Sequence, residues 1–289
     1  MLCLLISTAI VAGEGAWVAA GDPVPYRAFA REFAAGSYAQ SSGLESASTL
    51  LIRRNNDEFR FQYEMKTDDG GTFAATGHTR FVGDWVELVV ETLEQNRDFE
   101  IDGRHYYSRD IIKCTIFKFD NIIFMIMDNQ LAGFCNDVNL GREPRQMTDG
   151  DYFFRDLGEK DTVAATPELP PHVEKMILVK PVVGAVLSVE DGKARINLGG
   201  RDRVWKGMVL YCEPAEKRKQ ELFGERKEDP KRYRALLRVV DVRDTSCVAD
   251  IHRIPPSKKS VPICQGYKVY SRIPDSADKS GVRASVYRN

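Results

Sequence analysis

The sequence predicts a mainly β protein with two domains: an N-terminal antiparallel meander with a short helix, and a C-terminal small β-barrel. Two observations carry this prediction. Apolar and polar residues alternate with period two over many short runs, as in half-buried strands, and turn-forming residues separate these runs. The length of 289 residues also suits two domains, each able to bury its own core.

The most regular strand pattern lies in residues 184–212. Asp191 and Gly192 provide the positive φ angles of a tight hairpin turn. The expected apolar positions on its two sides are Ala185, Leu187 and Val189, then Ala194, Ile196 and Leu198. Further strands are expected at 207–211, 235–242, 245–251 and 266–270. Six short strands predict a closed or nearly closed barrel, which removes exposed strand edges.

This order of motifs resembles the small C-terminal β-barrel of the flagellar assembly protein T family and, more loosely, the periplasmic barrels of the rod-shape-determining protein C family. The likeness covers residues 184–271. Arg203 stands where such barrels have the first glycine of a G-V-x-x-G-M turn. The resemblance implies an adaptor that binds other envelope components, and it implies no catalytic residue. The matching positions are Asn197-Leu198-Gly199, Val204, Gly207 and Met208.

An apolar run without charges, residues 2–12, is followed by Val18-Ala19-Ala20, the small-residue pattern of a signal-peptidase site. Glu14 interrupts the apolar character, so the segment is too short to span a membrane. We expect a signal peptide at residues 1–20 and an exported, periplasmic or envelope-associated protein. The alternative is a buried or disordered N-terminal helix.

The N-terminal domain is expected at residues 21–166. Gly36-x-Tyr38 followed by a meander is similar to lipocalin-like and META-type barrels of bacterial envelopes. This resemblance implies a barrel whose mouth holds a small apolar ligand. The alternative is that the same aromatic residues fill the barrel core. The ligand-lining residues would be Phe59, Phe61, Tyr63, Phe73 and Trp85. The expected helix is 28–35, and the expected strands are 47–52, 59–65, 72–81, 85–90, 113–118 and 121–126.

A second helix is expected after an N-cap at Asp128 or Asn129, and Gly141 would end it. The tract aromatic-Cys-Asn-x-x-Asn-x-Gly-Arg-Glu-Pro-Arg, followed by Tyr-Phe-x-Arg, resembles one in uncharacterised exported bacterial envelope proteins that carry the same C-terminal barrel. Its charged residues are interface candidates, with a solvated turn as the alternative. The apolar helix face is Leu131, Phe134, Cys135 and Val138. The interface candidates are Arg142, Glu143, Arg145 and Arg155.

Closely spaced prolines in residues 166–172 predict a stiff, extended spacer, which places a linker at residues 167–183 before the barrel domain at 184–289. Residues 213–234 mix many acidic and basic side chains. Such a run indicates a solvated helix or mobile loop, with a partner-binding arm as the alternative.

The composition argues against several classes of partner. With 41 Lys and Arg against 42 Asp and Glu, the chain lacks the basic balance of a nucleic-acid-binding protein. The same balance gives no attraction to an anionic membrane, so we expect peripheral or no membrane contact. The cysteines form no C-x-x-C pattern, and we expect Cys114, Cys212 and Cys247 to be small core residues.

No motif for catalysis, a cofactor or a metal is present: H-E-x-x-H, G-x-S-x-G and phosphate-binding glycine loops are all missing. The sequence therefore predicts a non-enzymatic envelope protein that acts as a binding or adaptor module for an envelope protein partner. One alternative is a carrier of a small apolar ligand in the N-terminal barrel. Another is a hydrolase that uses His105 and Asp110.

Overall fold

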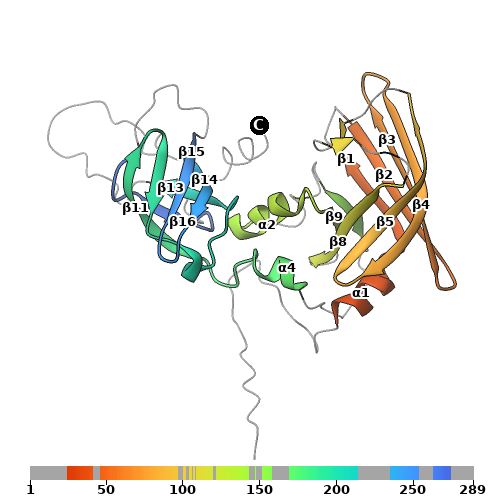
Figure 1. The fold of residues 1–289 in the computed structure, drawn as a ribbon, viewed down its shortest axis with the longest axis horizontal. Helices are drawn as coiled ribbons and strands as arrows, with labels where there is room; N and C mark the ends of the chain where they lie inside the picture. Colours follow the sequence, from red (N-terminus) through yellow and green to blue (C-terminus); the bar gives the residue numbers. More distant parts are fainter. Residues whose placement is uncertain are drawn as a thin grey trace, which may run out of the picture.

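A computed structural model shows two closed antiparallel barrels, one of eight and one of six strands, with short helices between them and at one end of the first barrel (Figure 1). The mainly β prediction is confirmed. The expected signal peptide and all but the first residue of the charged insertion lie outside the described residues. The structure describes residues 25–41, 46–96, 100–101, 104–105, 107, 109–119, 122–142, 147, 152–157, 169–213, 235–253 and 263–274.

The first barrel follows chain order and closes where Ala39 of the first strand pairs with Phe154 of the last. The six predicted meander strands are confirmed, whereas β1 and β10 were not predicted. A separate two-stranded sheet pairs β6 (Glu100–Ile101) with β7 (Arg104–His105). The barrel strands are β1 (Gly36–Ser41), β2 (Ser46–Asn55), β3 (Glu58–Thr67), β4 (Thr72–Val82), β5 (Trp85–Gln95), β8 (Ile111–Phe119), β9 (Ile122–Met127) and β10 (Phe153–Asp156).

The helix α1 (Tyr26–Phe33) covers one end of the first barrel (Figure 1). It begins two residues earlier than predicted, because Pro25 serves as its N-cap. Phe29 is fully buried in the barrel core. The Tyr26 hydroxyl accepts a 2.8 Å hydrogen bond from the backbone N–H of Ile116, which lies beyond the last residue of β8 paired with β5. The helix thus completes the backbone pairing of the barrel as well as its core.

Arg155 of β10 fastens the closing strand to this end of the barrel. Its guanidinium donates to the carbonyl of Phe33, at 3.2 Å, and to that of Ala35, where α1 ends. It also lies over the Tyr38 ring, 5.4 Å from the ring centroid. Gly36 is required here, because a Cβ at this position would overlap the guanidinium.

The second barrel has the strand order β11-β12-β15-β14-β13-β16. All six predicted strands and the closure are confirmed, and Asp191 and Gly192 have positive φ angles of 49° and 75°. The predicted inner face of the first strand is wrong at Leu187, because a register shift between Val186 and Ser188 places Val186 in the core. The strands are β11 (Val183–Glu190), β12 (Lys193–Ile196), β13 (Val209–Glu213), β14 (Ala235–Val242), β15 (Cys247–Arg253) and β16 (Lys268–Tyr270).

Part of the expected extended linker is helical. Pro171 is the first residue of α4 (Pro171–Glu174), where proline is tolerated because the first N–H of a helix has no partner within the helix. Val173 and Ile177 are buried in the apolar layer between the barrels. The linker therefore packs into the molecule and does not merely span the distance between its two domains.

Candidate functional site: the interdomain interface

The helix α2 (Leu131–Leu140) connects β9 to β10 and lies between the two barrels (Figure 1). The predicted helix and its end are confirmed: Gly141 adopts a left-handed conformation, with φ of 81°, and its N–H bonds to carbonyls of the last turn. The predicted N-cap is wrong, because Gln130 occupies that position. Phe134 of this helix is fully buried.

Asn136 of α2 binds the backbone of the second barrel. Its Nδ2 donates to the carbonyl of Gly207 at 3.1 Å, and its Oδ1 accepts from the N–H of Val209 at 2.9 Å. Val209 is the first residue of β13. One amide side chain therefore satisfies a donor and an acceptor of the same strand end, as a neighbouring strand would.

Asn139, one turn further along α2, repeats this arrangement on the linker. Its Nδ2 donates to the carbonyl of Met176, and its Oδ1 accepts from the N–H of Leu178, both at 2.9 Å. The Met176 carbonyl also accepts from the indole Nε1 of Trp205, at 3.0 Å, so the second barrel meets the linker at the same atom. We call Asn136 and Asn139 the asparagine clamp.

Asp137 lies between the two clamp residues and points back into the first domain. Its carboxylate, which is fully buried, accepts hydrogen bonds of 2.9 Å from Arg142 and from the hydroxyl of Tyr152. Arg142 is itself largely buried. A buried carboxylate with charged and neutral donors fixes orientation, because the loss of either partner leaves an unfavourable buried charge. This contact joins the end of α2 to the residue that leads into β10.

An apolar layer fills the space between α2, the linker and the outer face of the first barrel. Phe134 is central to it, with its ring 4.6 Å from Phe117 and 5.3 Å from Tyr152 between centroids. The layer explains why every residue of β9 is buried: one face serves the barrel core and the other serves this layer. Its members include Phe117, Ile122, Phe124, Ile126, Leu131, Phe134, Cys135, Tyr152, Val173 and Ile177, with Trp205 packed against them.

His172 of α4 packs on the first barrel. Its ring stacks on Trp85, with centroids 4.1 Å apart and planes inclined by 16°, and its Nε2 lies 3.1 Å from the hydroxyl of Thr115. Burial lowers the pKa of His172, and this effect outweighs the opposing influence of Asp84. The neutral imidazole is therefore favoured at the interface.

This lowered pKa predicts an acid-sensitive stability. Between the folded pKa of His172 and its ordinary value, about 6.5, the unfolded chain binds more protons than the folded chain. The free energy of unfolding is therefore expected to fall as the pH drops through this window. His172→Phe, which keeps the stacking on Trp85, is expected to flatten this part of the profile in urea titrations at several pH values. His252→Phe, in β15 of the second barrel, is the control, and an unchanged slope in His172→Phe would contradict the assignment.

Arg203 supplies a further contact between the second barrel and the linker. It has a positive φ of 60°, which is unfavourable for a side chain with a Cβ. Its guanidinium donates to the carbonyl of Glu174 in α4. The arginine thus provides a link to the linker that a glycine would lack.

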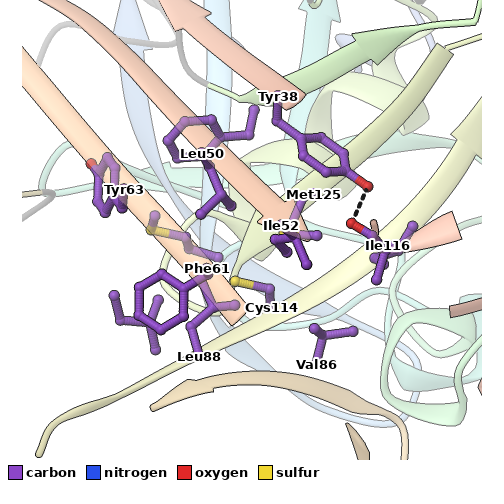
Figure 2. Close-up of a cluster of buried hydrophobic side chains, with 14 of the residues drawn as sticks. Tyr38, Leu50, Ile52, Phe61, Tyr63, Val86, Leu88, Cys114, Ile116 and Met125 are labelled. Atoms are coloured by element: carbon purple, nitrogen blue, oxygen red, sulfur yellow. Dashed lines mark hydrogen bonds between the residues drawn. The ribbon is translucent and has the colours of Figure 1, made fainter. Parts of the chain in front are cut away.

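The structure brings together four of the five predicted ligand-lining residues. Phe59, Phe61, Tyr63 and Phe73 are buried in the core of the first barrel, where the Tyr63 and Phe73 rings lie 5.4 Å apart. Figure 2 shows Phe61 and Tyr63 among other apolar side chains of this core. Trp85 is not part of this lining, because it packs in the apolar layer of the interface.

The predicted interface residues have different outcomes. Arg142 lies at the interface, through its ion pair with Asp137. Arg155 binds α1 and Tyr38 within the first domain, so an interface role for it stays a prediction. Glu143 and Arg145 lie outside the described residues. The clamp asparagines were not singled out, although their spacing of three residues places them on one side of a helix.

The groups considered for catalysis are not assembled into a site within the described part of the chain. Asp110 accepts a 2.9 Å hydrogen bond from the N–H of Tyr107 in a turn, and the side chain of His105 is outside the described residues. Burial raises the pKa of Cys135, Cys212 and Cys247 to about 12, which favours their neutral thiol forms. The prediction of core cysteines is confirmed at Cys114, Cys212 and Cys247.

Among the described residues, no three His, Cys, Asp or Glu side chains are grouped in a way that would hold a metal ion. No helix among them has both the length and the apolar character to cross a membrane.

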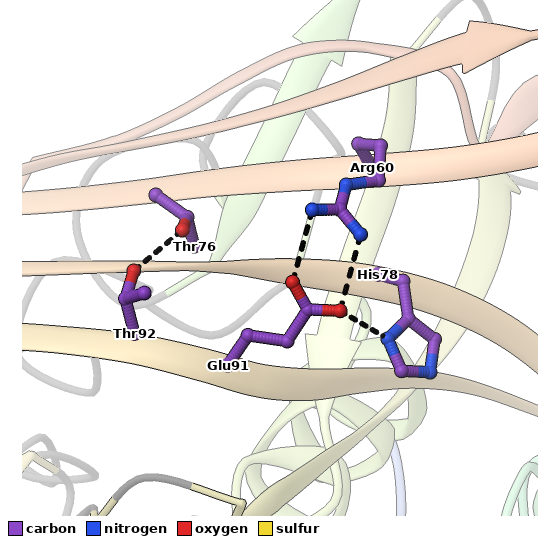
Figure 3. Close-up of polar contacts among 5 residues, drawn as sticks. All are labelled: Arg60, Thr76, His78, Glu91 and Thr92. Carbon is purple, nitrogen blue, oxygen red and sulfur yellow. Dashed lines mark hydrogen bonds and ion pairs between the residues drawn. The ribbon is translucent and has the colours of Figure 1, made fainter.

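A polar cluster lies on the outer face of the first barrel, away from the interface. Glu91 accepts two hydrogen bonds from Arg60, at 3.1 and 2.9 Å, and lies 2.8 Å from Nδ1 of His78 (Figure 3). The His78 contact, followed by the Arg60 contacts, lowers the pKa of Glu91. The cluster lies at a register shift beside Gly77, where a Cβ would collide with the carbonyl of Val89. The side chains of Arg60, His78 and Glu91 are all well exposed, so we assign this cluster to a solvated sheet face.

The interface is therefore the part of the described chain where buried polar groups from both domains converge. Comparison with known proteins found no matching family model and no matching curated protein, so the likeness of either barrel to a family stays a prediction from its motifs.

Proposed function

We propose that the protein is a non-enzymatic, exported envelope protein that acts as an adaptor. It would hold two β-barrels in one fixed arrangement, so that partners bound to them are kept at a set distance. The asparagine clamp is the observation that carries this proposal, because it joins the two domains through specific hydrogen bonds to backbone atoms.

Physical reasoning supports a fixed arrangement. Domains within one chain ordinarily move relative to one another unless their interface is large and apolar. Here the apolar layer around Phe134 is combined with four amide hydrogen bonds from Asn136 and Asn139 and with the buried contact of Asp137. Each of these polar groups would be costly to bury without a partner, so the hydrogen bonds select one relative orientation.

The experiment is a cross-linking pull-down from the cell envelope of the native host, followed by native mass spectrometry. The wild-type chain is expected to recover complexes that contain partners of both barrels. The double variant Asn136→Ala/Asn139→Ala is expected to retain each partner singly but to lose most of the joint complex. Thr76→Ala, on the outer face of the first barrel, is the control.

Two outcomes would count against the adaptor. Recovery of one small apolar molecule per chain, with no protein partner, would favour the carrier alternative. Joint complexes recovered equally by the clamp variant and the wild type would show that a fixed arrangement is not needed.

A further inference from the structure

Three of the most exposed large apolar side chains lie close together in the sequence. Val179, Val183 and Leu187 are 66%, 59% and 40% exposed. The other two such residues in the described part of the chain, Val82 and Tyr107, belong to different segments of the first domain. Single exposed apolar residues are ordinary, whereas a group of them marks an interaction surface.

The strand register places two members of this group, Val183 and Leu187, on the outside of the second barrel, and the exposed Val179 precedes β11 in the chain. Val183 of β11 pairs with Tyr270 of β16, so the two side chains share a face. Leu187 is the extra residue of the register shift in β11, and it is turned outward while its neighbour Val186 is buried. We call Val179, Val183 and Leu187 the β11 stripe.

The β11 stripe is continuous with the interdomain interface. Tyr270 packs against a buried apolar cluster in which Leu140 of α2 meets the outer face of the second barrel. Because Val183 lies beside Tyr270, apolar surface extends from this cluster along β11 to Leu187. The cluster consists of Leu140, Val209, Tyr211, Leu236 and Ile273.

The surroundings of the stripe carry cations that form no ion pair with a described residue. Lys180 follows Val179 and is exposed. Lys268 pairs with Ala185 of β11, and Arg195 pairs with Ser188, so both flank the stripe. Glu213 of β13 lies opposite Lys268 in the sheet. Its carboxylate accepts a hydrogen bond from the hydroxyl of Tyr211.

We propose that the β11 stripe, with its flanking Lys180, Arg195 and Lys268, is a docking surface for an envelope protein that presents an apolar segment bordered by carboxylates. This inference rests on the proposed adaptor function and names one of its binding surfaces. The charges select the partner: a second copy of this chain would bring the same three cations against one another.

A photo-cross-linking amino acid placed at Leu187 tests the proposal in the native host. Adducts are expected with one envelope protein, and the cross-linked peptide is expected to carry Asp or Glu next to apolar residues. The matched control is the same probe at Val82, which is also exposed but lies on the first barrel, and it is expected to give no such adduct. A second probe at Val183 is expected to give the same adduct, which guards against a folding defect at either position.

Charge reversal of the flanking cations is the second test of this docking surface. Arg195→Glu/Lys268→Glu is expected to lower the adduct yield at Leu187 by about tenfold, because rim charges govern the rate and selectivity of association. Arg53→Glu/Lys66→Glu makes the same change of charge on the outer face of the first barrel and is expected to have no effect.

Several outcomes would overturn this inference: adducts with a second copy, with lipid or with another segment of the same chain, a yield at Leu187 no higher than at Val82, or insensitivity to the charge reversal. None of these outcomes would by itself contradict the adaptor function. That function is tested by whether the wild-type chain recovers both partners together and whether the clamp variant loses this joint complex. Absence of the joint complex from the wild-type chain, with the Leu187 adduct intact, would instead overturn the adaptor and leave this surface in place.

Discussion

Replacing Asp137 with alanine is expected to lower the free energy of unfolding by about 3–5 kcal/mol, the range for breaking a buried ion pair by removal of one partner. The substitution would leave the largely buried guanidinium of Arg142 and the hydroxyl of Tyr152 without this acceptor. Urea denaturation followed by tryptophan fluorescence measures the change, since Trp85 and Trp205 both pack against the apolar layer of the interface.

Two further variants separate the charge pair from the loss of side-chain volume. Asp137→Asn keeps the shape but removes the charge, so it is expected to be almost as destabilising as Asp137→Ala. The double variant Asp137→Ala/Arg142→Ala is expected to be less destabilised than the sum of the single variants, because the largely buried cation that loses its contact with Asp137 is removed as well. A strictly additive result, or a loss below about 1 kcal/mol for Asp137→Ala, would contradict the role of this pair.

Replacing both clamp residues with alanine is expected to uncouple the two barrels. Asn136→Ala removes the partners of the Gly207 carbonyl and the Val209 N–H, and Asn139→Ala removes the acceptor of the Leu178 N–H, at a cost of about 1–3 kcal/mol per buried group. The Met176 carbonyl keeps its hydrogen bond from Trp205. Asn136→Ala/Asn139→Ala is therefore expected to change a single calorimetric unfolding transition into two, with the less stable barrel unfolding first.

Asn96 offers a matched control for the clamp. Its side chain also makes a double hydrogen bond to backbone, with Oδ1 2.9 Å from the N–H of Thr72 and Nδ2 3.0 Å from the carbonyl of Gly70, but it does so within the first barrel at an exposed turn. Asn96→Ala is expected to lower the stability of that barrel slightly and to keep one transition. Two transitions in the wild type, or one in the clamp variant, would contradict the coupling.

The strands that could be predicted are those whose pattern is local. β3 alternates large apolar and polar side chains, and Asp191 with Gly192 marks the turn between β11 and β12, so both features are visible in the sequence. The first and last strands of the large barrel are different. β1 consists mostly of small and polar residues, and β10 has only four residues, so their strand character depends on pairing with each other and with β2 and β9.

The interface could be predicted only in part, because its partners come from distant segments. The apolar spacing of α2 correctly indicated a helix with a buried face at Phe134. The clamp residues bind backbone atoms near Gly207 and Met176, and no pattern in the helix itself identifies these acceptors. The charged residues of this region were easier to identify as interface candidates in the sequence. One of them, Arg155, instead binds α1 where the first barrel closes.

The position of α2 in the chain has a consequence for biosynthesis. Because this helix precedes β10, a nascent chain completes the eight-stranded barrel only after the segment that will receive the second domain has emerged. Until then β1 and β9 each lack a neighbour, and unpaired strand edges are templates for association with other chains. A chain truncated before Phe153 is therefore expected to leave both edges open and to aggregate.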